Sequence, residues 1–98
     1  MSWSGYYLKN GFKCHLELIN FNCDPDYGII SGQTVDGGVV NGAIKKNREF
    51  TFTLKTEDFD ILCFWGSMCK NRETICGNFG IEMDESDGTF RIEHIERI

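Results

Sequence analysis

Few residues in this 98-residue sequence have the type and spacing of catalytic groups. Cys14 and His15 are adjacent, which would suit a nucleophile and its base, but neighbouring side chains in a β-strand point to opposite faces and cannot hydrogen-bond to each other. His94 stands near the end of the chain, where a histidine is more often a surface residue than a catalyst. No Ser, His and Asp set stands out, and no glycine-rich phosphate loop precedes a helix. We therefore predict no catalytic residue and expect the protein not to be an enzyme.

The cysteines and the acidic stretches are the remaining candidates for redox or metal chemistry. The cysteines are odd in number and form no CxxC motif, which disfavours structural disulfides and a tetrahedral zinc site; they stand at positions 14, 23, 63, 69 and 76. The acidic residues at 24–26 and 84–87 lack the spacing of an EF-hand calcium loop. We expect reduced thiols, of which Cys23 and Cys69 are candidates for exposure, and we predict no metal site and no cofactor.

The charge of the chain argues against several classes of partner. Its net charge is −5, and its lysines and arginines are scattered rather than gathered into a basic run. Because such a run is needed to neutralise many phosphates, we expect neither nucleic acid nor an anionic membrane surface as a partner. No apolar segment approaches the roughly 20 residues that span a bilayer, and the N-terminus MSWSGYY lacks the pattern of a signal peptide. We expect a cytoplasmic protein.

Short runs rich in β-branched and aromatic residues recur along the chain, and each is closed by Gly, Asn or Asp. The eight runs span residues 3–8, 13–21, 28–35, 39–46, 49–56, 61–69, 74–82 and 89–95. Short links such as Asn10-Gly11 favour antiparallel pairing of consecutive runs, and a meander of eight strands protects its edges best by closing on itself. The sequence therefore predicts an all-β fold, a small antiparallel up-and-down eight-stranded barrel that residues 1–98 form as a single domain.

Glycines near the middle of five runs fit a narrow barrel, because they relieve crowding where a strongly coiled sheet bends. They are Gly5, Gly32, Gly42, Gly66 and Gly77. Alternation then assigns bulky side chains to the interior: Leu16, Leu18, Phe50, Phe52, Leu54, Leu62, Phe64, Ile75, Phe79, Ile81, Phe90 and Ile92. An eight-stranded barrel encloses space for such side chains or for one small molecule. So bulky a set favours an interior that the protein fills itself.

The run ILCFWGSM is apolar on both faces, because its inward residues are matched by Cys63 and Trp65 on the outside. An apolar outer face of a barrel strand is usually covered, and no helix is expected in this chain to cover it. A second copy or another protein is one candidate for the cover, and a loop of the same chain, such as residues 24–27, is the other. Our leading hypothesis is a non-enzymatic binding or protein-interaction module that forms a homodimer, or binds another protein, through Cys63, Trp65 and Ser67.

The strand pattern resembles that of the avidin and streptavidin type of eight-stranded barrel over nearly the whole chain. The similar stretches are the aromatic-Gly opening strand WSGYYLKNG, then GIISGQTVD, FTFTLK, the aromatic-x-Gly of CFWGSMC and the final strand GTFRI. The resemblance implies a calycin-like barrel with a shallow ligand site at one end and a tendency to pair through barrel exteriors.

The biotin-binding residues of that family are not matched. Avidin-like proteins hold biotin with Asn, Ser and Tyr side chains and a box of Trp, whereas the corresponding positions here are approximately Gly5, Tyr7, Thr34, Leu54, Phe79 and Gly88. Each lost polar partner of a buried heterocycle costs about 1 to 3 kcal/mol, so tight biotin binding is not expected. An alternative function is the carriage of one small apolar ligand in the barrel interior, with Thr34 as a polar anchor. Its site would be lined by Tyr7, Thr34, Leu54, Phe64 and Phe79.

Overall fold

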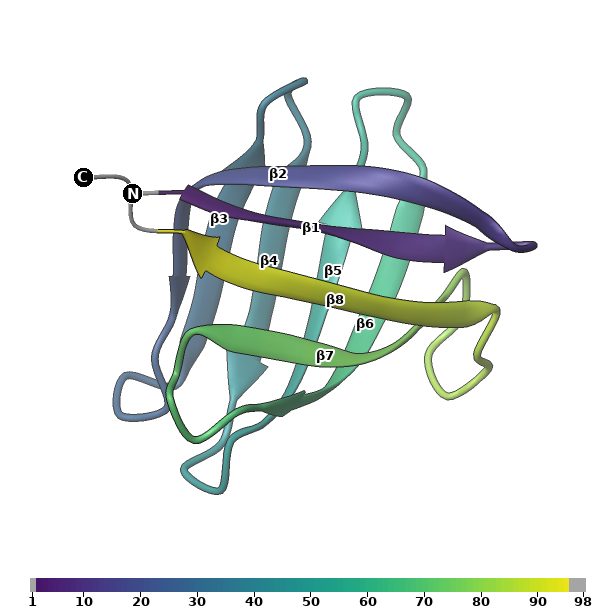
Figure 1. Cartoon of the computed structure of the whole chain (residues 1–98). Coiled ribbons are helices and arrows are strands. Elements are labelled where there is room, and N and C mark those ends of the chain that lie inside the picture. The colour runs from purple at the N-terminus through teal and green to yellow at the C-terminus, as the bar shows by residue number, and fades with distance from the viewer. Residues whose placement is uncertain (1, 96–98) are drawn as a thin grey trace.

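The computed structural model describes residues 2–95, which form eight β-strands (Figure 1). The strands are β1 (Ser2–Lys9), β2 (Phe12–Cys23), β3 (Ile29–Thr34), β4 (Val39–Ile44), β5 (Glu49–Lys55), β6 (Ile61–Met68), β7 (Thr74–Gly80) and β8 (Gly88–Ile95). All eight predicted runs are confirmed, and their ends agree with the observed strands to within two residues. In the described part of the chain, no helix has the length and apolar character needed to cross a membrane.

The strands form a closed antiparallel barrel in sequence order, which confirms the predicted up-and-down topology. Each strand pairs with the next one along the chain, and β8 pairs with β1 to close the sheet. The closing register runs from Ser2 opposite Ile95 to Tyr7 opposite Phe90, so the first and last strands lie side by side in Figure 1. Closure pairs every one of the eight strands on both of its sides, which protects the backbone groups of the sheet from pairing with another chain.

Aromatic rings fill the middle of the barrel. Phe52 stacks on Phe64 with 4.9 Å between ring centroids, and Phe90 meets Phe64 edge-on at 5.0 Å. Each such pair stabilises a core by about 0.5 to 1.5 kcal/mol beyond the burial of its area. The predicted inward residues are buried, except that Leu62 is only partly buried and Ile81 is exposed.

The inward prediction for Ile81 is wrong because β7 ends one residue earlier, at Gly80. Ile81 is 65% exposed and begins the loop of residues 81–87. Its backbone N–H donates a hydrogen bond of 3.1 Å to the carboxylate of Asp87, which closes this loop on itself. Strand alternation therefore cannot place Ile81, since the chain has already turned away from the sheet.

An irregularity in β2 changes which residues of that strand face inward. Asn20 has a positive φ of 52°, and the register with β3 shifts between Ile19 and Asn22. Leu18 is buried before this bulge and Phe21 after it, so the inward alternation moves by one residue. The bulge thereby brings the ring of Phe21 into the core.

Two of the five strand glycines are register partners across β6 and β7. A Cβ atom at Gly66 or at Gly77 would collide with a backbone carbonyl of the opposite strand. The next residues in register are Phe50 and Phe90, whose rings lie 5.9 Å apart inside the barrel. The glycine pair therefore lets the two backbones approach closely and leaves room for these rings.

Candidate functional site

The two ends of the barrel differ in how they are filled. The open end is bounded by the loops at residues 10–11, 35–38, 56–60 and 81–87, and the plugged end by the loops at residues 24–28, 45–48 and 69–73. At the plugged end, Trp3 packs edge-on against Phe21, with 5.2 Å between ring centroids, and stacks on His94 at 4.9 Å. Because Trp3 and Phe21 are both buried, they close the interior from this side.

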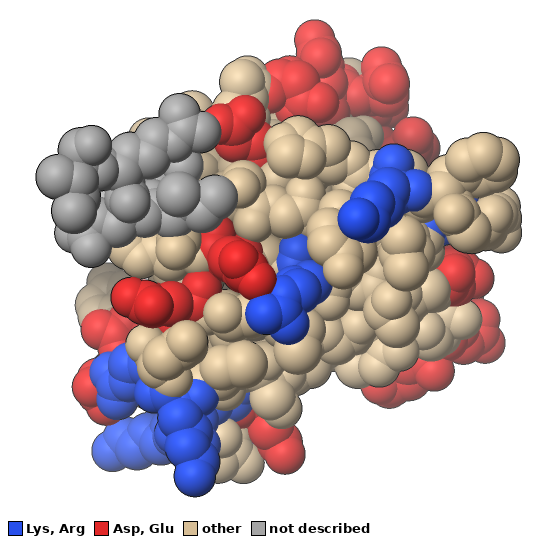
Figure 2. All heavy atoms as spheres, viewed as in Figure 1, with Lys and Arg blue, Asp and Glu red and all other residues tan. Residues whose placement is uncertain are grey.

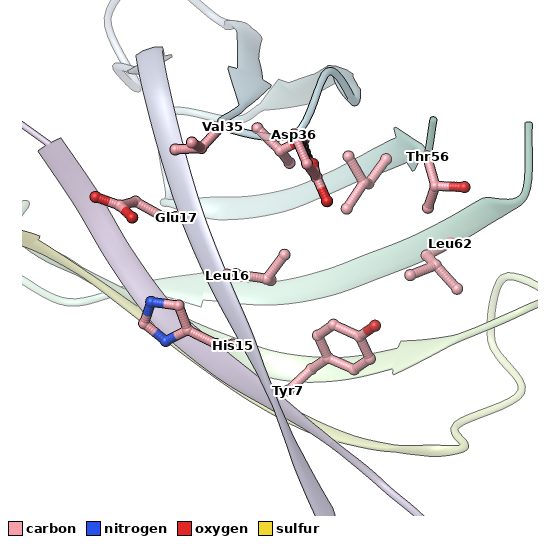
Figure 3. Close-up of a pocket in the computed structure, with 10 residues that line it drawn as sticks. Tyr7, His15, Leu16, Glu17, Val35, Asp36, Thr56 and Leu62 are labelled. Carbon is pink, nitrogen blue, oxygen red and sulfur yellow. Dashed lines mark hydrogen bonds between the residues drawn. The ribbon is translucent and has the colours of Figure 1, made fainter. Parts of the chain in front are cut away.

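The open end contains a cavity of about 260 Å³, shown in Figure 3. The cavity is lined by Tyr7, His15, Leu16, Glu17, Thr34, Val35, Asp36, Leu54, Thr56 and Leu62. Three of the five residues predicted to bind a ligand, Tyr7, Thr34 and Leu54, therefore line one cavity. The other two, Phe64 and Phe79, are buried in the core, and Tyr7 packs edge-on against their rings at centroid distances of 6.1 and 4.8 Å.

The inner wall of this cavity is mostly apolar, because it is built from residues of four strands that point into the barrel. Leu16 comes from β2, Leu54 from β5 and Leu62 from β6, and Tyr7 adds its ring from β1. Burial raises the pKa of the Tyr7 phenol above its ordinary value, and the Cys14 thiol and the Asp36 carboxylate raise it further. The phenol is therefore neutral at ordinary pH and retains a proton that it can donate.

A hydrogen-bonded turn between β3 and β4 supplies the polar side of the cavity. The buried hydroxyl of Thr34 accepts a hydrogen bond of 2.7 Å from the backbone N–H of Gly38 and donates one to the carboxylate of Asp36. The N–H of Thr34 donates to the carbonyl of Gly38 at 3.0 Å, and Gly37 takes a φ of 101°, which suits glycine. The hydroxyl proton of Thr34 is thus donated within the turn, where it holds the Asp36 carboxylate in place.

Asp36, His15 and Glu17 line the cavity but are not among the predicted ligand residues. The sequence signal for Asp36 is the segment TVDGG, in which a threonine before an Asp-Gly turn can fix the carboxylate. His15 and Glu17 are exposed on the outer face of β2, so they form the edge of the cavity rather than its wall. Of these three residues, Asp36 is the one whose carboxylate points into the cavity in Figure 3.

Charge is distributed unequally between the two ends. The four loops of the open end contain eight acidic residues and no lysine or arginine: Asp36, Glu57, Asp58, Asp60, Glu82, Asp84, Glu85 and Asp87. The strand ends beside these loops add Lys9, Lys13 and Lys55. The loops of the plugged end contain five basic residues, Lys45, Lys46, Arg48, Lys70 and Arg72, and three acidic ones, Asp24, Asp26 and Glu73. In Figure 2 many of the acidic side chains lie at the top and right of the molecule and several basic ones at the lower left, while other side chains of both signs lie on the face between them.

The open end also exposes large apolar side chains, of which Val35 lines the cavity. The most exposed are Phe12 and Phe59, followed by Ile81, Val35 and Ile61. Phe59 stands in the loop of residues 56–60 with a positive φ of 66°, and its ring lies 5.2 Å from the ammonium of Lys55. The open end therefore combines an apolar rim with a surplus of negative charge.

The outer face of β6 is covered in part by the chain itself. Cys63 is buried, and its thiol donates to the carbonyl of Ile81 at 3.8 Å, so the loop of residues 81–87 covers it. Trp65 is half-buried, Ser67 is exposed, and both line a surface groove of about 400 Å³. The same groove is lined by Ala43, Ile44, Lys45, Glu49, Phe50, Thr51, Gly66 and Asp84.

The covering loop is not the one considered from the sequence. The loop of residues 24–28 is instead held at the plugged end, where the guanidinium of Arg72 lies 3.6 Å from the carboxylate of Asp24 and 3.1 Å from that of Asp26. The loop of residues 81–87 takes the covering position because it folds back from the end of β7, the strand that pairs with β6.

No family model, no curated protein and no solved structure matches this chain. Its classification therefore rests on its own strand order: it is an eight-stranded closed antiparallel β-barrel. The resemblance to the avidin type concerns this architecture and assigns no family.

The thiols differ in burial and in acidity. Cys69 is exposed as expected, but Cys23 is buried, because the bulge in β2 turns it inward. Burial raises the pKa of the Cys23 thiol to about 12, with a smaller contribution from the negative charge of Asp24, so the thiol is inert near neutral pH. Among residues 2–95, no group of three or more His, Cys, Asp or Glu side chains is arranged to hold a metal ion.

Proposed function

We propose that this protein is a non-enzymatic binding protein that holds a small, largely apolar ligand at the open end of its barrel. The observation that carries the proposal is the cavity of about 260 Å³ at that end, into which Leu16, Leu54, Leu62 and the ring of Tyr7 point. An apolar concave site with a few fixed polar groups is the usual form of a small-molecule site. The cavity occupies only the open end of the barrel interior, because buried side chains of the protein fill the core below it.

The size of the cavity limits the ligand to about one ring with a short substituent. Burying roughly 150 Å² of ligand surface at about 25 cal/mol per Å² would contribute about 4 kcal/mol, and the ligand's loss of translational and rotational freedom offsets a large part of this. Apolar contact alone therefore predicts weak binding, and polar contacts must supply any higher affinity. We propose no cofactor, no nucleic acid and no membrane as partners, and a cytoplasmic location, in keeping with the acidic charge of the chain.

We also propose that this barrel is related to the avidin type in its architecture. Support comes from the eight-stranded up-and-down order and from a candidate site at one end of the barrel. Biotin is not the proposed ligand, since Tyr7, Thr34 and Leu54 stand at positions where the avidin type has a different set of side chains.

The experiment that tests the proposal is a titration of the labelled protein with phenethyl alcohol, followed by amide NMR. Binding should shift the amides of Tyr7, Leu16 and Leu54 in a saturable manner. The variant Leu62→Trp should fill the cavity and abolish these shifts, whereas the matched variant Ile29→Trp, exposed near the plugged end, should retain them. Shifts that are absent at the open end, or that survive Leu62→Trp unchanged, would contradict the proposal.

A second candidate function is self-association, or binding of another protein, through the outer face of β6. The groove of about 400 Å³ beside Trp65 and Ser67 favours it, although Cys63 is covered by the chain's own loop. Sedimentation at high micromolar concentration should then show a homodimer that Trp65→Glu converts to a monomer, while Thr89→Glu, on the exposed outer face of β8, should not. A wild-type monomer at that concentration would reject self-association.

A further inference from the structure

We infer that the ligand of the open-end cavity carries a positive charge, and that the structure suits a small organic ammonium ion with a short apolar body. This inference rests on the proposed function, because it names the chemical class of the ligand for the same site. Three features carry it: a fixed carboxylate on the cavity wall, negative charge around the mouth, and an aromatic ring inside.

The carboxylate of Asp36 is held in place to face the cavity. The Thr34 hydroxyl donates to one carboxylate oxygen, and the bond of 2.7 Å from Gly38 to Thr34 fixes that hydroxyl in turn. Figure 3 shows the Asp36 side chain directed from the turn toward the space between Leu16 and Thr56. Within residues 2–95, the second carboxylate oxygen has neither a hydrogen-bond donor nor a cation as a partner, so it is available to a ligand.

The surroundings of Asp36 are negative. The four loops of the open end contain eight acidic residues and no basic one, and in the described part of the chain none of the eight takes part in an ion pair. Glu17 adds a further carboxylate at the edge of the cavity. Two of the three lysines at the strand ends of the open end lie over aromatic rings, Lys13 over Tyr6 at 4.5 Å and Lys55 over Phe59 at 5.2 Å. A concave site lined by charge of one sign attracts ligands of the opposite sign.

The ring of Tyr7 in the cavity wall suits both the positive charge and the apolar body of an organic ammonium ion. Tyr7 presents its ring to the cavity, and cations are attracted to the face of an aromatic ring. Its phenol stays neutral because burial and the negative groups beside it raise its pKa, so the ring adds no charge of its own. An anionic ligand would meet Asp36 on the cavity wall and Glu17 at its edge, and like charges repel.

The test compares three probes that share a phenethyl body and differ in charge: phenethylamine, phenethyl alcohol and hydrocinnamate. At neutral pH and low salt, the amine should bind at the open end about tenfold more tightly than the alcohol, since hydrogen bonds to ionised groups are stronger than neutral ones. Hydrocinnamate should give no saturable shifts. Raising the salt concentration should weaken binding of the amine and leave the alcohol unchanged.

The variant Asp36→Asn tests whether the carboxylate makes the contact. Its amide oxygen can still accept the hydrogen bond from Thr34, so the turn should be retained. The variant should bind phenethylamine no more tightly than phenethyl alcohol, with binding of the alcohol unchanged. The matched variant Asp58→Asn removes the same charge from another loop of the open end and should retain most of the preference for the amine.

The outcomes separate the inference from the proposed function. Equal affinity of the amine and the alcohol, or an amine preference that survives Asp36→Asn, would overturn the inference and leave the binding site in place. Failure of all three probes to bind at the open end would overturn both. Binding of the alcohol that Asp36→Asn abolishes together with that of the amine would show that the variant damages the site, and Asp36→Glu, which keeps the charge, should then preserve the preference; its loss in that variant would overturn the inference.

Discussion

The plugged end and the open end of the barrel use the same eight strands for opposite purposes. At the plugged end, large rings meet: Trp3 contacts Phe21 and His94, and Arg72 links two loops through Asp24 and Asp26. At the open end, aliphatic side chains and one phenol stop short of the mouth, and the loops carry charges of the same sign. The difference indicates that the plugged end contributes more to the stability of the fold. The open end is less tightly packed and carries like charges that repel, and it contains an accessible cavity.

The strongest test of this contrast is the removal of one large side chain at each end. Trp3→Ala should lower the free energy of unfolding by about 3 to 5 kcal/mol, because it leaves a cavity in a buried cluster. Leu62→Ala should lower it by about 1 kcal/mol, because Leu62 is only partly buried and already borders a cavity. Urea unfolding of both variants measures the two values. Equal losses would show that the ends do not differ in packing.

A smaller effect should appear at alkaline pH, where a thiol at the plugged end titrates. The pKa of Cys23 rises from 9.0 to about 12 in the folded protein, so the folded state binds the proton more tightly than the unfolded state. The resulting stability is fully present below pH 9 and is lost as the pH rises from 9 to 12, by at most about 4 kcal/mol.

The variant Cys23→Ala should therefore show a shallower decline in stability over this range than the wild type does. Tyr7→Phe, at the open end, should flatten the decline less, since the pKa of Tyr7 is raised but the phenol is only half-buried. Urea midpoints measured at several pH values provide the comparison. Identical slopes for Cys23→Ala and the wild type would contradict it.

The hydrogen-bonded turn at the open end should make a moderate contribution to the free energy of unfolding. Thr34→Val removes the partner of the buried Gly38 N–H and of Asp36, and should cost about 1 to 3 kcal/mol. Thr34→Ser keeps the hydroxyl and should recover most of this loss. The control Thr53→Val, whose exposed hydroxyl bonds weakly at 3.4 Å, should change stability by less than about 0.5 kcal/mol. If Thr34→Val left the free energy of unfolding unchanged, the hydrogen bonds of Thr34 would not be holding the turn and Asp36 in place.

The smallest effect belongs to the ion pairs of the plugged end. Arg72→Ala should lower the free energy of unfolding by less than about 1 kcal/mol, because both carboxylates and the guanidinium are exposed to solvent. Thermal unfolding at low and at high salt should show that the loss is confined to low salt. A loss that persists at high salt would point to packing by the Arg72 side chain rather than to charge.

The strands, their order and the inward aromatic residues could be predicted because they depend on local signals. Alternation in FTFTLKT and the Asn10-Gly11 turn are determined by neighbouring residues, and closure follows from the number of strands. The bulge at Asn20 could not be predicted, because it adds one residue to a run that still alternates on either side. Ile81 was misplaced for a similar reason, since the end of β7 depends on a bond to Asp87.

The candidate site was predictable only in part. Leu54 follows from its inward position, and Tyr7 and Thr34 from their correspondence to ligand-site positions of the avidin type; all three line one cavity. Asp36 could not be assigned in the same way, because a turn residue has no defined face until the hydrogen bond from Thr34 orients it. Cys63 was predicted to be free for an interface, but whether a loop folds over a strand depends on contacts that strand alternation does not encode.

A crystal structure of the protein soaked with phenethylamine tests the central claim most directly, since it shows the occupant of the open end. The account predicts the phenyl ring against Tyr7, Leu54 and Leu62, with the ammonium within hydrogen-bonding distance of the Asp36 carboxylate. A cavity filled by the protein's own side chains, or an amine bound in the groove beside Trp65 and absent from the open end, would contradict it.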